Sequence, residues 1–224
     1  LLAANVRGRC CASFPMHPSA NFLPRAEDTP KPIYLVVNAD ESEPGTFKDR
    51  ELMLRVPHLF IEGVFIASYT IGSSLAFIYV RGEYLTEYEI LTAALEEARE
   101  AGFVGKDVLG SGWDLTVVVH RGAGAYICGE ETGLLESLEG SRGQPRTKPP
   151  FPAISGLYAS PTLINNVETL ATVPKIVEMG GAAYAALGVE NSAGTRVFSL
   201  SGNVANGGNY ELELGTTLRE LIYD

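Results

Sequence analysis

The chain has 224 residues, a formal net charge of -10 and a hydrophobic share of 46%. This composition is typical of a folded globular protein and excludes extended disorder. The negative charge argues against nucleic acid or an anionic membrane as the main partner, because a polyanion needs a basic surface to release its counterions. No apolar stretch reaches the roughly 18 to 20 residues of a membrane-spanning helix, so no direct membrane insertion is expected.

The termini and the cysteines set further limits. The chain begins at Leu1 without a signal-peptide pattern and ends at Asp224 inside a predicted helix, so we expect both ends to be cut from a longer protein. Its three cysteines, of which Cys10 and Cys11 are adjacent, form neither a disulfide framework nor a CxxC metal set. Cys128 is expected to be a buried thiol. These features favour a cytosolic protein.

Residues 1–30 are irregular and rich in Pro, Ala and Ser, and regular structure is predicted from about Lys31 onward. Apolar runs and helical spacing then alternate. They predict a strand at 33–37, helices at 47–55 and 57–69, a strand at 75–80, a helix at 84–101 and a strand at 115–119. This alternation implies parallel strand pairing in a doubly wound α/β layer.

The second half of the chain predicts a helical run that ends at Leu138 and a helix over residues 165–179, which Pro174 interrupts or delays. After the Gly180-Gly181 break and a short Ala-rich helix, residues 195–200, 210–214 and 217–223 predict a strand, a strand and a helix. This last set indicates a second, small α+β domain. We therefore divide the chain into an irregular segment (1–30), an α/β domain (31–194) and the start of a second domain (195–224).

A cluster of hydrogen-bond acceptors follows the first predicted strand. Its members are Asn38, Asp40, Glu41 and Glu43. Open α/β sheets bind ligands in the crevice beyond the carboxyl ends of their strands. Carboxylates at that position suit sugar hydroxyls and ring N–H groups rather than phosphate. The alternative is an exposed turn capped by Ser42, with Pro44 in the first turn of the next helix.

A second loop follows the strand at residues 115–119. Gly122 and Gly124 allow a backbone to approach a flat ring or a phosphate, although the same spacing fits a structural turn. Glu130 and Glu131 open the next helix, where carboxylates compete for the amides that would bind an anion, so the pair fits a sugar or amide clamp better. The alternative for Glu130 is a favourable charge in the first helical turn.

Residues 140–152 combine three cations with four prolines in a stiff, extended loop. Such a loop can lie over a nucleotide, with Phe151 stacked on a base and Lys148 paired with a phosphate. A plain surface linker is the alternative. Asn165 and Asn166 open the next predicted helix, where capping is the ordinary role of Asn.

No nucleophile, base or metal motif accompanies these loops. His17, His58 and His120 show no metal-binding spacing, and the sequence holds no P-loop and no GxSxG. Hydride transfer to a flavin needs no protein acid or base, because the cofactor carries the chemistry. We therefore expect binding loops without a catalytic residue or a metal ligand.

Four motifs in order carry a resemblance to a known family. They occupy residues 34–46 with 48–51, then 122–132, 148–152 and 165–169. They resemble the FMN- and NADH-binding subunit of bacterial NADH:quinone oxidoreductase, respiratory complex I, and its relatives in NAD-reducing hydrogenases and NAD-dependent formate dehydrogenases. The resemblance runs from about Lys31 to the end of the chain. It implies an NADH dehydrogenase subunit in which hydride passes from NADH to FMN and electrons pass onward to iron–sulfur clusters and quinone.

The resemblance also implies which residues bind each cofactor. The flavin would be lined by Asn38, Asp40, Glu41, Tyr126, Gly129, Asn165 and Asn166, with Gly122 in the same cofactor-binding loop. The NADH side would be formed by Glu43, Glu130, Glu131, Lys148 and Phe151, with Phe14 and Phe22 as adenine-stacking residues. Glu43 and Glu130 are expected to favour NADH over NADPH, because they repel a 2′-phosphate.

The implied fold is α/β, with a Rossmann-like, mostly parallel sheet flanked by helices and followed by the start of a ubiquitin-like β-grasp domain. The implied partners are the adjacent [2Fe-2S] thioredoxin-like subunit and the large iron–sulfur subunit of complex I. The implied location is cytoplasmic, in the peripheral arm of an inner-membrane complex. The family's [4Fe-4S] cluster is expected only in a C-terminal helical domain beyond Asp224, since Cys10, Cys11 and Cys128 cannot build one.

The chain departs from the family in the glycine-rich loop that presents amides to the FMN phosphate. The family's Gly-Arg-Gly-Gly-Ala-Gly-Phe-Pro aligns with residues 8–15, where Cys10, Cys11 and Ser13 replace glycines, and Ser19 stands in place of a lysine. The lost lysine removes a charge-assisted hydrogen bond of roughly 1.5 to 3 kcal/mol, or about one to two orders of magnitude in FMN affinity. Because the changes are confined to residues 10–21, they resemble a compensated reading-frame slip, which resequencing the coding DNA would settle.

Two alternatives fit the same residues. One is the flavin subunit of an NAD-reducing hydrogenase or an NAD-dependent formate dehydrogenase, in which the cofactor sites are shared. The other is a degenerate, flavin-less structural subunit, which the four replacements in the glycine-rich loop motivate.

Overall fold

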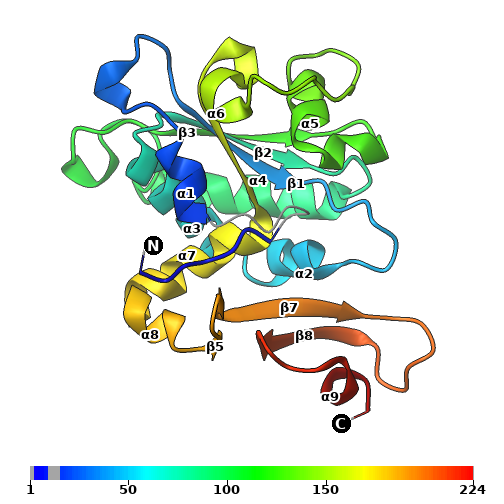
Figure 1. The fold of residues 1–224 in the computed structure, drawn as a ribbon. Helices are drawn as coiled ribbons and strands as arrows, with labels where there is room; N and C mark the ends of the chain where they lie inside the picture. The colour runs from blue at the N-terminus through cyan, green and yellow to red at the C-terminus, as the bar shows by residue number, and fades with distance from the viewer. Residues whose placement is uncertain (1–2, 10–15, 224) are drawn as a thin grey trace.

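The centre of the molecule is a four-stranded sheet in which all strands are parallel. The computed structural model describes residues 3–9 and 16–223 (Figure 1). The strands are β1 (Tyr34–Ala39), β2 (Leu75–Val80), β3 (Thr116–Arg121) and β4 (Thr162–Asn166), in the order β3-β2-β1-β4. The chain therefore moves outward from β1 to β3 on one side and returns to pair β4 with the other side of β1. Open α/β sheets bind ligands at such a switch point.

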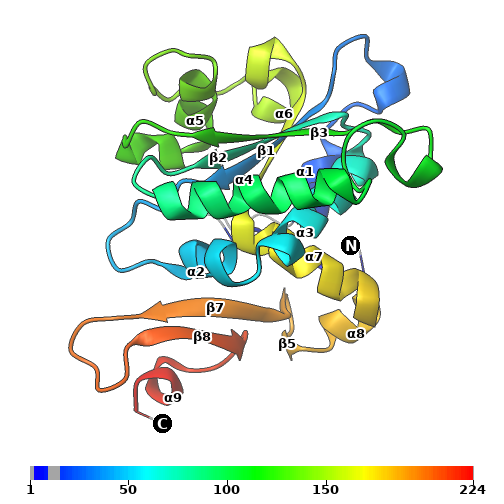
Figure 2. The same ribbon diagram turned by 180° about the vertical axis from the view of Figure 1, so that it is seen from behind.

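Helices cover both faces of this sheet, and Figures 1 and 2 show the layers from opposite sides. One face carries α2 (Lys48–Arg55), α3 (Pro57–Ile71), α4 (Leu85–Glu100) and α7 (Val167–Met179). The other face carries α5 (Glu131–Leu138) and α6 (Pro152–Ser155). The predicted doubly wound α/β layer is therefore confirmed.

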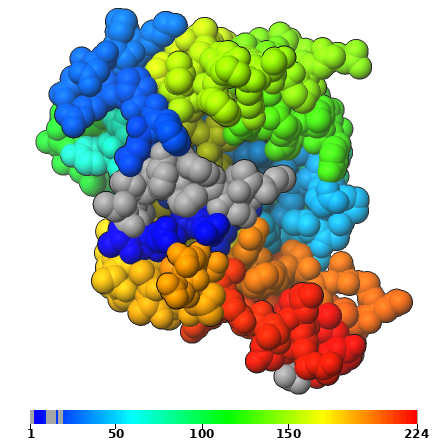
Figure 3. Space-filling model, in the orientation of Figure 1, coloured from blue at the N-terminus to red at the C-terminus, as the bar shows by residue number. Residues whose placement is uncertain are grey.

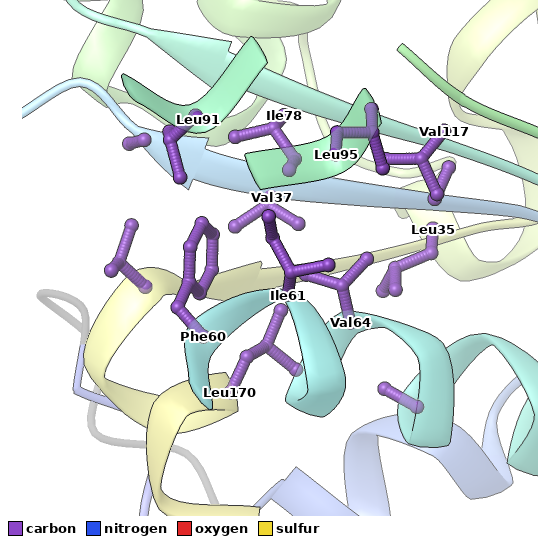
Figure 4. Packing of buried hydrophobic residues seen from close by; sticks show 14 of the residues in the cluster. Leu35, Val37, Phe60, Ile61, Val64, Ile78, Leu91, Leu95, Val117 and Leu170 are labelled. Atoms are coloured by element: carbon purple, nitrogen blue, oxygen red, sulfur yellow. The ribbon is translucent and has the colours of Figure 1, made fainter. Parts of the chain in front are cut away.

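The packing of the core explains why the sequence of β1 begins with a continuous run of apolar residues. Leu35 and Val37 face the larger helical layer, whereas Val36 belongs to the apolar cluster on the α5 side. A strand buried on both faces needs apolar side chains at successive positions. Figure 4 shows strand residues packed against α3 and α7, with Leu35, Val37, Ile78, Phe60, Ile61, Val64 and Leu170 labelled. Each such buried side chain stabilises the fold by about 1.5 to 3 kcal/mol.

Local signals set the ends of the longest packed helices. Pro57 occupies the first turn of α3, and Gly72 ends that helix with a left-handed φ of 69°, which a glycine adopts without strain. Leu91, Leu95 and Ala98 recur at helical spacing along α4 and are buried against the sheet. These helices therefore bury the faces that their sequence periodicity predicts.

The remaining elements follow the same chain order. They are α1 (Met16–Asn21), α8 (Gly181–Ala185), β5 (Gly188–Val189), β6 (Ser192–Ala193), β7 (Thr195–Leu200), β8 (Gly208–Glu213), α9 (Leu218–Tyr223) and 3-10 turns at Ala26–Asp28, Val108–Gly110, Tyr126–Gly129 and Leu157–Ala159. β7 and β8 form an antiparallel sheet of their own. The N-terminal residues run along α7 and α8 (Figure 3). Ala4 and Val6 form an apolar cluster with Ile176 and Tyr184.

Three local predictions were wrong. Residues 165 and 166 were predicted as the first residues of a helix, but they are the last two residues of the unpredicted strand β4, which pairs with β1. The helix α7 begins at Val167, and Asn166 is its N-cap. Pro174 lies inside a continuous α7, where burial of its ring offsets the missing hydrogen bond. The segment predicted as irregular contains α1, whose Met16 is buried in the main core.

Among the described residues, no single helix is long and apolar enough to cross a membrane; the pair α2 and α3 passes the length and composition test only together, across a bend of 100°.

Candidate functional site

A cleft of about 750 Å³ lies beyond the carboxyl ends of β1 and β4, at the switch point of the sheet. The predicted site residues that line it are Asn38, Asp40, Glu41, Glu43, Tyr126, Gly129, Glu130, Glu131, Lys148, Asn165 and Asn166. Further lining residues are Arg9, Ser42, Thr46, Lys48, Asp49, Ile127, Ile164 and Arg196. Four loops far apart in the sequence therefore meet at one site.

The end of β1 forms one wall of this cleft. Asn38 Nδ2 donates to the carbonyl oxygen of Gly129 at 2.8 Å, and Asn38 Oδ1 accepts from the amide of Asp40 at 3.1 Å. The first bond ties β1 to the Tyr126–Gly129 turn, and the second stabilises the chain just after β1. The hydroxyl of Ser42 donates to the carboxylate of Asp40. Burial raises the pKa of Asp40, and the Ser42 hydrogen bond offsets part of that rise.

Glu41 is turned toward α2. Its two carboxylate oxygens accept from the backbone amides of Asp49 and Arg50, each at 3.0 Å, and so satisfy free N–H groups in the first turn of that helix. Burial, followed by the charge of Asp49, raises the pKa of Glu41. Arg81 Nη1 donates to the Glu41 backbone carbonyl at 2.9 Å. Glu41 therefore shapes the wall of the cleft by capping α2.

Asn166 anchors the floor of the cleft. Its Nδ2 donates to Asp49 at 2.6 Å, and its Oδ1 accepts from Lys48 Nζ at 3.0 Å and from the amide of Glu168 at 3.1 Å. The last bond is the N-cap of α7, so the capping role expected of Asn is confirmed. Burial lowers the pKa of Lys48, but the charges of Asp49 and Glu168 outweigh it and the net shift is upward.

The amide of Asn165 is unsatisfied. Its side chain is only 5% exposed, and Nδ2 has no hydrogen-bond partner within the part of the chain that the structure describes. A buried donor without a partner costs about 1 to 3 kcal/mol. Because Asn165 lines the cleft, an acceptor on a bound molecule, such as a ring carbonyl, would satisfy it.

The opposite wall comes from the start of α5 and the loop before α6. Glu130 caps α5 by accepting from the amides of Thr132 and Gly133, each at 2.8 Å. Burial opposes ionisation of Glu130, but these bonds and Lys148 prevail and lower its pKa. Lys148 Nζ lies 3.3 Å from Glu130 and also donates to Glu131. Burial lowers the pKa of Lys148, and the two carboxylates more than reverse that effect.

Three predicted site residues lie outside the described lining of the cleft. A Cβ at Gly122 would lie 2.7 Å from the hydroxyl oxygen of Tyr79, so close ring packing requires this glycine. Phe151 and Phe22 are 56% and 64% exposed, and neither is among the lining residues. Phe14, Cys10, Cys11 and Ser13 fall outside the described residues, as does the side chain of Ser19.

The sequence prediction missed four charged residues of the cleft. Lys48 and Asp49 lie within the 48–51 motif, so that motif already held a signal for them. Arg9 lies within the glycine-rich motif at residues 8–15, which also held a signal. Arg196 carried none, because it reaches the cleft only through the packing of β7.

A second cavity of about 870 Å³ lies between α3, α4 and the loop before β3. Aromatic and aliphatic side chains such as Phe65, Tyr69 and Trp113 line most of it, and it lies away from the strand ends. Its polar lining residues are His58, Glu62, Glu97 and Ser111, and none of them is one of the predicted site residues. Within the described ranges, no group of three His, Cys, Asp or Glu side chains is arranged to hold a metal ion.

Curated proteins match nearly the whole length of this chain. The chain is 55% identical over 219 residues to a subunit of the NADH-quinone oxidoreductase of Rhizobium meliloti, covering 98% of this chain and 52% of that protein. It is 54% identical over 220 residues to the corresponding NADH-quinone oxidoreductase subunit of Aquifex aeolicus, covering 98% and 51%. It is 49% identical over 222 residues to the mitochondrial NADH dehydrogenase [ubiquinone] flavoprotein 1 of Dictyostelium discoideum, covering 99% and 46%. The chain thus spans about half the length of the curated relatives it matches.

A solved structure is similar over nearly the whole chain. The crystal structure of an NAD+-reducing [NiFe]-hydrogenase in the H2-reduced state superposes with a TM-score of 0.90 at 41% identity, covering 98% of this chain and 37% of that one. Residues 1–175 match the family described as the Nuo51 FMN-binding domain. The chain, with its cleft at the switch point of a parallel sheet, therefore belongs to the Nuo51 FMN-binding domain family.

Proposed function

We propose that the chain is the FMN- and NADH-binding part of an NADH:quinone oxidoreductase flavoprotein subunit. That enzyme transfers hydride from NADH to FMN and electrons onward to iron–sulfur clusters and quinone. The observation that carries the proposal is the Asn165 amide, which lacks a partner among residues 3–9 and 16–223 and is buried at the switch-point cleft among carboxylates and amides. A flavin ring supplies the acceptor that this donor lacks.

The cleft residues fit the polar edge of a flavin. Asn165 would donate to a ring carbonyl or ring nitrogen, and Asp40 would accept from a ring N–H or a ribityl hydroxyl. Asn38 and Asn166 would hold the two strand ends apart through their bonds to Gly129 and Asp49. When bound, FMN accepts hydride and returns electrons singly, so the protein needs no acid or base of its own.

The NADH side of the site would lie along Glu43, Glu130 and Glu131. Ionised carboxylates accept from ribose hydroxyls and repel a 2′-phosphate, so NADH is preferred to NADPH. Burial opposes the charge on Glu130, but hydrogen bonding lowers its pKa and keeps the carboxylate charged at neutral pH. Lys148 would keep these acidic side chains in place through its contacts with Glu130 and Glu131.

Complex I is favoured over a soluble hydrogenase as the setting. The identity to the two bacterial NADH-quinone oxidoreductase subunits is 54 and 55%, compared with 41% to the hydrogenase chain. The proposed partners are the [2Fe-2S] thioredoxin-like subunit and the large iron–sulfur subunit, in the cytoplasmic peripheral arm of the complex. Residues 195–224 would begin a ubiquitin-like β-grasp domain. Identification of co-purifying subunits distinguishes complex I from a hydrogenase or formate dehydrogenase.

Titration of the chain with FMN, followed in the visible flavin absorption band, tests the proposal. The matched variant restores the family's loop with C10G, C11G, S13G and S19K. We expect both proteins to bind FMN, the variant more tightly by about one to two orders of magnitude. Binding by the variant alone would instead favour the flavin-less structural subunit. Absence of binding by both would contradict the assignment of the cleft as a flavin site.

A further inference from the structure

The cations of the cleft differ in how far neighbouring carboxylates neutralise them. Lys148 lies between Glu130 and Glu131. Lys48 Nζ lies 2.6 Å from the carboxylate of Asp49 and 3.1 Å from that of Glu168. These two ammonium groups already have anionic partners, so neither is available to a ligand without breaking an existing pair.

Arg9 is committed in the same way. Its guanidinium lies 3.8 Å from Glu168, donates to the Tyr184 hydroxyl at 3.2 Å and also donates to the backbone carbonyl of Thr195. The Arg9 side chain is buried together with that of Glu168. It therefore acts as a tie between the N-terminal segment, α7 and β7.

Arg196 is different. It lines the cleft, yet within the described part of the chain its guanidinium has neither a hydrogen-bond nor an ion-pair partner. Because the other lining cations are paired and Asp40, Glu43 and the α5 carboxylates repel anions, the potential most favourable to an anion lies next to Arg196.

The backbone at Arg196 is held on both sides. Thr195 accepts from Arg9, and the amide of Val197 donates to Glu168 at 2.8 Å. The other edge of β7 pairs with β8, where Arg196 lies opposite Leu212. A side chain on a strand held at both edges is pre-positioned toward the cleft, which reduces the entropy lost when it binds a ligand.

We infer that Arg196 binds a phosphate group of the nucleotide in this cleft. The phosphate is either the monoester of FMN or the diphosphate of NADH, and the inference rests on the proposed function. A guanidinium binds phosphate oxygens through two parallel N–H bonds. Arg196 lies outside residues 1–175, which match the FMN-binding family. The β7–β8 hairpin thus completes a binding site whose other residues come from the preceding α/β layer and, through Arg9, from the N-terminal segment.

The test compares the chain with R196Q and with R196K. R219Q serves as the control, because Arg219 is an exposed residue of the same C-terminal segment, outside the cleft, and its substitution changes the net charge equally. Dissociation constants are measured for FMN and phosphate-free riboflavin, and for NADH and phosphate-free reduced nicotinamide riboside. Circular dichroism verifies that each variant is folded.

If FMN is the source of the phosphate, R196Q weakens FMN binding by about tenfold to a hundredfold and leaves riboflavin binding unchanged. If NADH is the source, the same selective loss appears for NADH against the riboside. R196K restores part of the loss, and R219Q has no effect. If the parent chain binds FMN and NADH and R196Q binds both with unchanged affinity, the inference about Arg196 is wrong and the proposed function still stands. A parent chain that binds neither nucleotide overturns the proposed function as well.

Discussion

The hydroxyl of Tyr126 donates to Oε2 of Glu43 at 2.5 Å, joining the turn after β3 to the loop after β1. Both residues line the cleft, so this bond holds the Glu43 carboxylate at its wall. In the proposed dinucleotide site, a carboxylate held in this way would discriminate by charge as well as by shape.

Glu43→Gln is therefore expected to raise the affinity for NADPH relative to NADH by about tenfold, since it removes roughly 1.4 kcal/mol of like-charge repulsion. The amide still accepts the Tyr126 hydrogen bond, so the wall keeps its shape. Binding of both dinucleotides is measured by calorimetry, with E89Q on the exposed face of α4 as the charge-matched control. An unchanged NADPH to NADH ratio would remove the charge argument for Glu43.

Asn165→Leu is expected to raise the stability of the ligand-free protein and to weaken its binding of FMN. The variant deletes a buried donor that has no partner in the described structure, so the free energy of unfolding is expected to rise by about 1 kcal/mol or more without ligand. FMN affinity is expected to fall by at least about tenfold, because the flavin loses a hydrogen bond. Urea unfolding and flavin titration check the two effects. A variant that loses stability and retains full FMN affinity would show that the Asn165 amide is satisfied within the protein.

Glu168→Gln is expected to destabilise the fold by about 3 to 5 kcal/mol, because Lys48 and Arg9 are left as buried cations short of a counter-charge. In this variant the amide of Val197 donates to a neutral side-chain amide instead of a carboxylate, so the β7–β8 hairpin is also held less firmly to α7. E178Q is the control, since Glu178 pairs with Lys175 on the exposed side of the same helix and such pairs contribute little. The free energy of unfolding is measured by urea denaturation. Equal, small losses for E168Q and E178Q would contradict a stabilising role of Glu168 as counter-charge to Lys48 and Arg9.

Glu130→Gln should change how stability depends on pH. Hydrogen bonds from Thr132, Gly133 and Lys148 lower the pKa of Glu130 below its ordinary 4.5 in spite of burial. A carboxyl whose folded-state pKa is lowered stabilises the protein above the unfolded value, and the contribution disappears as pH falls through the folded value. The parent chain should thus exceed E130Q in stability by about 1 kcal/mol at neutral pH, with the difference closing below pH 4.5. Unfolding curves at both pH values test this, and a difference independent of pH would contradict it.

Gly63→Ala should reverse the usual effect of that substitution in a helix. Alanine normally stabilises a helix interior by roughly 0.5 to 1 kcal/mol over glycine. At this position in α3, however, a Cβ would lie 1.9 Å from the backbone carbonyl oxygen of Leu170 in α7. Overpacking there is expected to cost about 1 to 3 kcal/mol. Thermal unfolding is compared with that of E62A, an exposed neighbour on α3, and a stabilised G63A would mean that α3 and α7 can separate without cost.

Much of the α/β layer was predictable from local patterns. Apolar runs placed β1, β2 and β3, and helical spacing placed α3 and α4, because burial on a sheet or a helix face imposes its own period on the sequence. β4 escaped prediction because its short segment ends in two asparagines that resemble a helix cap. One of them, Asn166, is both the last residue of the strand and the cap of α7, so only the pairing with β1 reveals the strand.

The candidate site was predictable to the extent that it depends on strand ends. Asn38 and Asp40 follow β1 directly, and their position alone indicated a ligand crevice. Gly122 was predicted as a cofactor-binding residue because glycine allows close approach, with a structural turn as the alternative. In the structure, a Cβ at Gly122 would collide with the Tyr79 ring, a contact that the sequence does not indicate. Side chains from other elements, such as Tyr79 in β2, decide whether a loop residue faces the cleft or packs against a ring.

The sequence by itself determined which segments form the sheet and its helices, and which loops carry polar groups to the strand ends, because these properties depend on neighbours along the chain. The tertiary structure alone decided how the charges are paired. Lys148 lies with the α5 carboxylates, Lys48 lies with Asp49 and Glu168, and Arg196 lines the cleft without a partner among the described residues. Electrostatic energy depends on distance through space and on burial, and neither quantity follows from separation in sequence.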